Sequence, residues 1–168
     1  MNIILIGFMG SGKSSVGHLL ADKMGMRYLD CDELISNTEK MPISAIFAKK
    51  GEEYFRKVET EVIKTLQDYD NFVVSTGGGM VLREENVKML KEIGRLVLLW
   101  AEPKVIFDRI HNQSHRPLLN VPDPMAAIEK ILNERRPIYD TVADFKVDAS
   151  NLKIEETAEK IIQWIKSK

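Results

Sequence analysis

The feature that most constrains this chain is an apolar run at residues 2–7 that leads directly into the segment GFMGSGKS, residues 7–14. A continuous apolar run suits a strand buried on both faces of a parallel sheet. The segment matches G-x-x-x-x-G-K-[ST], a pattern whose glycines let backbone N–H groups close around phosphate oxygens. A helical pattern follows from Lys13 to a break at Gly25, and its positive end would face the same anion. The opening residues therefore predict a strand, a phosphate-binding loop and a helix.

The rest of the chain alternates short apolar runs with helical patterns, which predicts an α/β fold with right-handed crossovers. We expect further strands at 27–30, 72–75, 96–100 and 145–147. We expect helices in pieces over 33–67, and then at 84–93, 103–111, 124–136 and 154–165. Residues 112–123 are polar and contain two prolines, so they predict a mobile loop. The sequence shows no internal repeat and no linker, so we expect a single domain over 1–168.

Composition excludes several classes of function. The formal net charge of -1 gives no support for nucleic-acid binding, which usually leaves a basic footprint. No run of 18 apolar residues is present, and the N-terminal residues lack the features of a signal peptide. The single cysteine, Cys31, fits a reducing compartment. We therefore expect a cytoplasmic protein that binds neither nucleic acid nor membranes. A monomer is a separate expectation, which composition does not address.

The phosphate loop narrows the function to ATP chemistry. A guanine-specific switch protein would carry N-K-x-D, which is absent, and a motor ATPase would be longer. A small ATP-dependent kinase that uses Mg²⁺ is the economical interpretation. Lys13 would reach the β- and γ-phosphates, and the Ser14 hydroxyl would bind Mg²⁺. The other nucleotide-binding candidates in this segment are Gly10, Ser11, Gly12 and Ser15.

Two acidic residues, Asp30 and Asp32, flank Cys31 where the second strand ends. We expect the chain to stay extended over 30–32. One could face Mg²⁺ and the other an acceptor hydroxyl. The alternatives are a solvated strand end, or Asp32 acting as the N-cap of the following helix. Cys31 itself is expected to point into the core.

Two more segments suggest a binding site. Arg56 and Glu59 lie three residues apart on an expected helix, where Glu59 could orient the arginine toward a carboxylate, although an ordinary surface pair is the alternative. Gly77, Gly78 and Gly79 follow a buried strand. A run of three glycines is useful where a ligand approaches the backbone closely, and the carboxyl end of a parallel strand is such a place.

Together these segments resemble the shikimate kinase family. The resemblance rests on GFMGSGKS, on D-x-D at 30–32, on F-R-x-x-E at 55–59 and on the glycine triplet. It also rests on R-P-L-L at 116–119 and on E-R-x-P-x-Y at 134–139. The order and spacing match across nearly the whole chain. The resemblance implies a P-loop NTPase fold of the nucleoside-monophosphate-kinase type, a three-layer α/β/α arrangement with a five-stranded parallel sheet. It also implies transfer of the ATP γ-phosphoryl group to the 3-hydroxyl of shikimate.

The same resemblance implies a role for each matching residue. Asp32 would contact the acceptor hydroxyls as the candidate base, and Arg56 and Arg135 would hold the carboxylate beside the glycine triplet. Asp30 and Ser14 would serve Mg²⁺, with Ser75 ordering a water. Arg109 would pack on adenine. Arg116, in a lid over about 112–123, would reach the phosphates, and a helical segment over about 31–60 would bind shikimate. The catalytic candidates are thus Lys13, Asp32 and Arg116.

Two points stay open at this stage. The segment 147–151 lacks the arginine that some relatives place near adenine, and Arg136 is an alternative to Arg135 because the two are adjacent. The rival functions are a gluconate-type sugar kinase, which the glycine triplet disfavours, and a nucleotide-binding regulator without transfer activity. The latter would be expected to lack Asp32, Arg56 and Arg135, which are all present.

Overall fold

The computed structural model describes residues 1–113 and 120–168. Its centre is a five-stranded sheet in the order β2-β3-β1-β4-β5, in which every neighbouring pair is parallel. The strands are β1 (Asn2–Ile6), β2 (Arg27–Asp30), β3 (Phe72–Ser75), β4 (Gly94–Trp100) and β5 (Phe145–Asp148). The α/β fold with a five-stranded parallel sheet is therefore confirmed.

The central strand explains why helices cover both faces of the sheet. Every residue of β1 is buried, and successive side chains of a strand point to opposite faces. Ile3 and Leu5 pack into one apolar cluster and Ile4 and Ile6 into another. Because both faces are apolar, each needs its own layer of helices, as the three-layer prediction requires.

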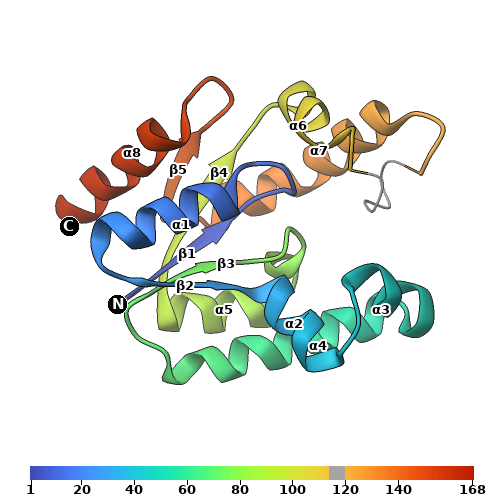
Figure 1. Ribbon diagram of the computed structural model, residues 1–168, viewed down its shortest axis with the longest axis horizontal. Helices are drawn as coiled ribbons and strands as arrows, with labels where there is room; N and C mark the ends of the chain where they lie inside the picture. Colours follow the sequence, from blue (N-terminus) through green and yellow to red (C-terminus); the bar gives the residue numbers. More distant parts are fainter. Residues whose placement is uncertain (114–119) are drawn as a thin grey trace.

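One layer consists of α1 (Lys13–Met24) and α8 (Ile154–Lys166), which lie side by side on the sheet (Figure 1). The α1 helix ends at Gly25, whose φ of 64° is the left-handed conformation that glycine adopts without strain. Ala158, Ile161 and Ile162 of α8 are buried against α1 and the sheet.

The opposite layer is formed by α4 (Glu52–Thr65), α5 (Glu84–Ile93), α6 (Pro103–Ile110) and α7 (Pro124–Val142). Two short 3-10 turns, η1 (Leu66–Asp68) and η2 (Met80–Leu82), precede and follow β3. The remaining helices, α2 (Cys31–Glu39) and α3 (Ile43–Lys50), lie beyond the carboxyl ends of β2 and β3 (Figure 1). The carboxyl edge of the sheet is thus flanked by the helical segment that was expected to bind the acceptor.

The extended conformation expected for 30–32 is wrong. Helix α2 begins at Cys31, because Asp30 caps it: its Oδ1 accepts hydrogen bonds from the backbone N–H groups of Asp32 at 2.8 Å and Glu33 at 3.1 Å. The N-cap of this helix is therefore Asp30 and not Asp32. Cys31 is fully buried, as expected, and burial raises the pKa of its thiol.

The expected end of a helix at Arg136 is also wrong, since α7 continues through Pro137 to Val142. Proline removes one helical N–H and crowds the carbonyl four residues earlier. That carbonyl belongs to Asn133, an exposed residue that water can reach. Tyr139 and Val142 pack into the core beyond the proline, which favours the continued helix. Among the described residues, no helix has the length and apolar character needed to cross a membrane.

Candidate active site

The loop between β1 and α1 has the backbone of an anion site. Gly10 and Gly12 have φ of 73° and 101°, a region that other residues rarely adopt. A Cβ atom at Gly10 would also lie 2.8 Å from Ile110 Cγ2, so this position has no room for a side chain. Ser11 is 1% exposed, and its Oγ makes no hydrogen bond within the described residues. A loop of inward-facing backbone with a buried polar group of this kind fits the phosphates of a nucleotide.

Lys13 lies over this loop. Its Nζ donates hydrogen bonds to the backbone oxygens of Gly7 at 2.7 Å and Phe8 at 2.9 Å. The ammonium group is therefore held at the loop, where the first turn of α1 also presents its N–H groups. Ser14 and Ser15, next along α1, are exposed.

The carboxyl ends of β2 and β3 bring Asp30 beside Ser75, which are partners in the parallel register. Tyr28 adds a hydroxyl that the sequence analysis missed. The Tyr28 hydroxyl donates to Asp30 Oδ2 at 3.4 Å. The pKa of Tyr28 is raised, because the effect of burial outweighs that of a hydrogen bond with Ser14, which lowers it. The polar groups of Ser14, Asp30 and Tyr28 therefore surround one point.

This point fits Mg²⁺ in the manner of kinases. Within residues 1–113 and 120–168, no group of three or more His, Cys, Asp or Glu could hold a metal. A site made only of protein ligands is not needed, however. Mg²⁺ keeps several waters and is commonly bound through one or two protein groups and substrate phosphates. His18, an exposed residue of α1, packs against Tyr28 with ring centroids 3.8 Å apart.

The glycine triplet lies against the charged residues that were expected to bind the acceptor. A Cβ atom at Gly77 would lie 2.9 Å from Asp32 Oδ1 and 3.0 Å from Glu59 Oε2. At Gly79 it would lie 2.6 Å from Arg56 Cζ. A side chain at either position would displace these charged groups, so the glycines let them lie against the backbone.

Arg56 and Glu59 form a buried pair. Arg56 Nη1 donates to Glu59 Oε1 at 2.6 Å, and the side chains are 13% and 0% exposed. Burial raises the pKa of Glu59, and the charge of Asp32 raises it further, whereas Arg56 lowers it. The second oxygen, Oε2, makes no hydrogen bond within the described residues. The alternative of an ordinary surface pair is excluded, because Glu59 has no exposed surface.

The structure distinguishes the two adjacent arginines of α7. Arg135 lies over the Phe8 ring at 5.6 Å, and a Cβ at Gly78 would lie 3.3 Å from its Nη1. Arg136 instead lies over Trp100 at 4.7 Å and pairs with Asp140 at 3.8 Å. Arg135 therefore faces the glycine triplet, and Arg136 faces away from it.

Tyr139 is a second residue that the sequence analysis did not single out. Fully buried, it donates from its hydroxyl to the backbone oxygen of Gly78 at 2.6 Å. Its spacing could have revealed it, because residues four apart share a helix face and Arg135 is four residues earlier. The E-R-x-P-x-Y segment thus contributes two side chains to the same turn.

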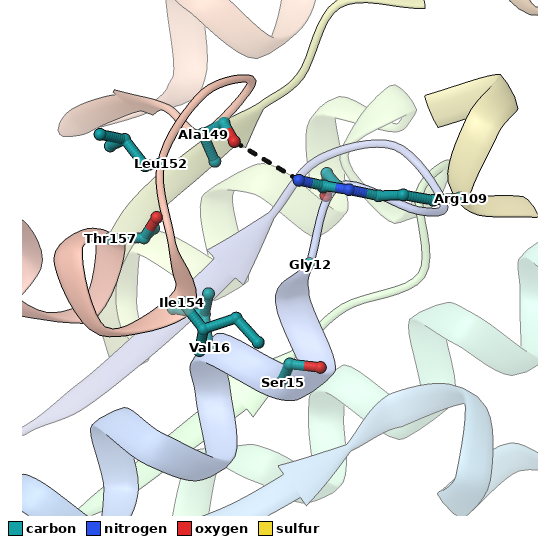
Figure 2. A pocket seen from close by; sticks show the side chains of 9 residues that line it. Gly12, Ser15, Val16, Arg109, Ala149, Leu152, Ile154 and Thr157 are labelled. Atoms are coloured by element: carbon teal, nitrogen blue, oxygen red, sulfur yellow. Dashed lines mark hydrogen bonds between the residues drawn. The ribbon is translucent and has the colours of Figure 1, made fainter. Parts of the chain in front are cut away.

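A cavity of about 200 Å³ lies beside the phosphate loop. Figure 2 shows Arg109 at its edge, reaching the backbone oxygen of Ala149 at 3.4 Å. Arg109 also donates to the Gly10 oxygen at 2.9 Å. The opposite wall is largely apolar and contains Leu152 and Ile154. Such a slot suits the flat faces of a nucleotide base.

Arg116 lies outside the described residues, as do positions 114–119 of the expected lid. The other candidates gather at the carboxyl edge of the sheet, with the phosphate loop on one side and the glycine triplet on the other. This arrangement defines a class: a P-loop kinase that brings a nucleotide and a small acceptor together.

Comparison with known proteins specifies the family within that class. Residues 9–166 match the shikimate kinase family. A shikimate kinase of Thermodesulfovibrio yellowstonii is 48% identical over 162 residues, which cover 96% of this chain and 93% of the relative. The chain belongs to the shikimate kinase family, whose members are ATP-dependent kinases that use Mg²⁺.

Solved structures of similar fold include members of the same family. Shikimate kinase from Acinetobacter baumannii, in complex with shikimate, has a TM-score of 0.94 at 36% identity, covering 99% of this chain and 93% of that one. A gluconokinase from Sinorhizobium meliloti has a TM-score of 0.57 at 16% identity, covering 96% and 89%. At that identity it shows the fold alone, so the gluconate-type alternative gains nothing beyond a shared architecture.

Proposed function

We propose that this chain transfers the γ-phosphoryl group of ATP to the 3-hydroxyl of shikimate, giving shikimate 3-phosphate and ADP. The observation that carries the proposal is the meeting of Arg56, Arg135 and Asp32 around the glycine triplet. Shikimate has one carboxylate and three ring hydroxyls, so a selective site needs paired cationic donors and a nearby acceptor of hydroxyl protons. The described residues offer both next to the phosphate loop.

On the nucleotide side, we assign the phosphates to the loop. Gly10, Ser11 and Gly12 would hold them through backbone N–H groups, together with Ser15 and the Lys13 ammonium group. Arg109 would cover adenine at the cavity of Figure 2. Arg116, from the lid over about 112–123, would reach the phosphates.

Ser14 and Asp30 would hold the metal, Asp30 through water, and Ser75 would order that water. Bound Mg²⁺ would neutralise charge on the phosphate oxygens. Asp30 already caps α2 with one oxygen, so only its second oxygen, near Tyr28, is directed toward this task.

On the acceptor side, Arg56 and Arg135 would bind the carboxylate of shikimate, since a planar guanidinium matches its two oxygens. Asp32 would accept a hydrogen bond from the acceptor hydroxyl. In the transfer, the hydroxyl oxygen bonds to the γ-phosphorus while the bond from that phosphorus to the ADP oxygen breaks. Asp32 takes the released proton. Lid closure would exclude water, which is a competing acceptor.

We further propose that the protein acts as a cytoplasmic monomer that binds neither nucleic acid nor membranes, with residues 1–168 working as one kinase domain. The near-neutral charge and the lone buried cysteine support this proposal. Sedimentation of the purified protein tests the monomeric state, for which a mass of 19.2 kDa is expected.

A coupled assay of ADP release tests the reaction. Shikimate, gluconate and buffer alone are compared at equal ATP and Mg²⁺. We expect rapid release with shikimate and background release in the other two reactions. Equal release in all three would indicate an ATPase, and release with gluconate alone would overturn the proposed acceptor.

A further inference from the structure

A buried polar link connects helix α4 to the turn that follows the glycine triplet. Thr60, which is 6% exposed, donates from Oγ1 to Asn86 Oδ1 at 2.8 Å. Asn86, which is fully buried, donates from Nδ2 to the backbone oxygen of Met80 at 2.9 Å.

The chemistry allows only one arrangement of this link. The Met80 oxygen can only accept, so the Asn86 amide must present its NH₂ group there and its oxygen to Thr60. The Thr60 hydroxyl has one proton. Its contact with the Arg56 backbone oxygen is longer, at 3.2 Å, so the shorter bond to Asn86 takes that proton. The orientation of the amide is thus set by both ends.

The position of the link suggests more than packing. Thr60 lies one helical turn after Arg56 on the same face of α4, and Met80 directly follows Gly79. The Arg56 guanidinium lies against Gly79. The link therefore joins the two backbones whose separation decides where Arg56 sits relative to the glycine triplet. A buried polar pair is not required for stability, because apolar groups of the same shape can replace both partners at little cost.

We propose that Thr60 and Asn86 are positioning residues for the acceptor: they hold helix α4 and the glycine turn at the separation that lets Arg56 bind a carboxylate. The proposal rests on the proposed function, which places the carboxylate of shikimate at Arg56. It assigns neither residue a contact with the substrate. Their loss should weaken acceptor binding and spare the nucleotide, whose loop lies on the other side of the site.

Titration calorimetry on Thr60→Val tests this role. Valine keeps the shape of threonine and removes the hydroxyl. We expect the Kd for shikimate to rise about fivefold, which corresponds to one lost hydrogen bond, and the Kd for ATP to stay within about twofold of the wild-type value. Thr60→Ser restores the hydroxyl and should return the Kd for shikimate toward the wild-type value.

Val62→Ala is the matched control. Val62 is buried on the same helix and is outside the link, so this variant should lower the Tm but leave the Kd for shikimate unchanged. Should Thr60→Val be too unstable to purify, Thr60→Val/Asn86→Leu replaces both polar groups with apolar ones and is expected to show the same weakening. An unchanged Kd for shikimate, or equal losses for both ligands, would overturn the proposal. Failure of the wild-type protein to bind shikimate would instead overturn the proposed function.

Discussion

The two sides of the candidate site are built in different ways. The phosphate-binding segment, residues 7–14, is continuous and runs from the end of β1 into the first turn of α1. The acceptor side gathers side chains from α2, α4 and α7 around a turn after β3. Between Asp32 and Arg135 lie more than a hundred residues, and only the parallel sheet brings them together.

The difference has consequences for mutation. Within the loop, groups are placed by local backbone conformation, so a change should act on one ligand group. On the acceptor side each charged group is placed by a neighbour, as Arg56 is by Glu59, and a change should spread to its partners. The following predictions test whether the two sides are separable in this way.

Lys13→Ala should have the largest effect, a loss of at least about a thousandfold in kcat, because phosphoryl transfer depends on positioned charge at the phosphates. The fold should survive, since Lys13 Nζ donates to backbone oxygens of its own loop. Steady-state kinetics measure kcat, and circular dichroism measures whether the variant is folded. Lys23→Ala, an exposed lysine on the same helix, should keep wild-type activity. An unchanged kcat for Lys13→Ala would remove the loop from the mechanism.

Asp32→Asn should lower kcat by about a hundredfold to ten thousandfold, the range for loss of a general base. It should leave ATP binding with Mg²⁺ mostly intact, because Asp32 faces the glycine triplet. Asp30→Asn should instead raise the Mg²⁺ concentration needed for half-maximal activity. Asparagine is a good N-cap, so α2 should stay folded in that variant. If calorimetry showed the opposite pattern, the roles of the two carboxylates would be exchanged.

Arg56→Lys and Arg135→Lys should each raise the shikimate KM about tenfold to a hundredfold. Lysine keeps the charge but loses the planar fork, and a charge-assisted hydrogen bond contributes about 1.5–3 kcal/mol. The ATP KM should change little. Arg136→Lys is the internal control, because Arg136 lies on Trp100. A crippled Arg136→Lys with a normal Arg135→Lys would show that the wrong arginine has been placed at the acceptor.

Gly79→Ala should have the smallest effect, an increase of about threefold to tenfold in the shikimate KM, since small displacements of a positioning group reduce binding. The Gly79 φ of -98° is open to alanine, so the backbone need not change. The new methyl group would displace the Arg56 guanidinium. Kinetics at saturating ATP measure the shift, and an unchanged KM would mean that Arg56 binds the acceptor from another position.

Sequence patterns predicted most of the fold because they report local preferences. Strand β3 and helix α5 lie where the apolar runs and breaks indicated. The errors occurred where a distant or specific contact outweighs such a preference. Pro137 should end a helix, yet Tyr139 and Val142 pack into the core beyond it. The chain at Asp32 was expected to be extended, yet the side chain of Asp30 caps α2 and places Asp32 in the first turn of that helix.

The candidate site divides in the same way. Its residue types could be predicted from short segments, and Arg56 with Glu59 could be paired by their spacing. Asn86 could not be singled out, because its partners Thr60 and Met80 lie on another helix and in a turn. Whether the pair of Arg56 and Glu59 is exposed or buried also depends on what packs over α4.

The sequence by itself determined the phosphate loop, the alternation of strands and helices, and the family. Each of these rests on neighbouring residues or on the order of short segments. The tertiary structure alone decided that Glu59 is buried and that Thr60 reaches Asn86. It also places Arg135, which the resemblance had favoured over Arg136, against the glycine triplet. The physical reason is that these contacts join residues far apart in the chain. Their distances are set by how helices pack on a parallel sheet, which no local pattern specifies.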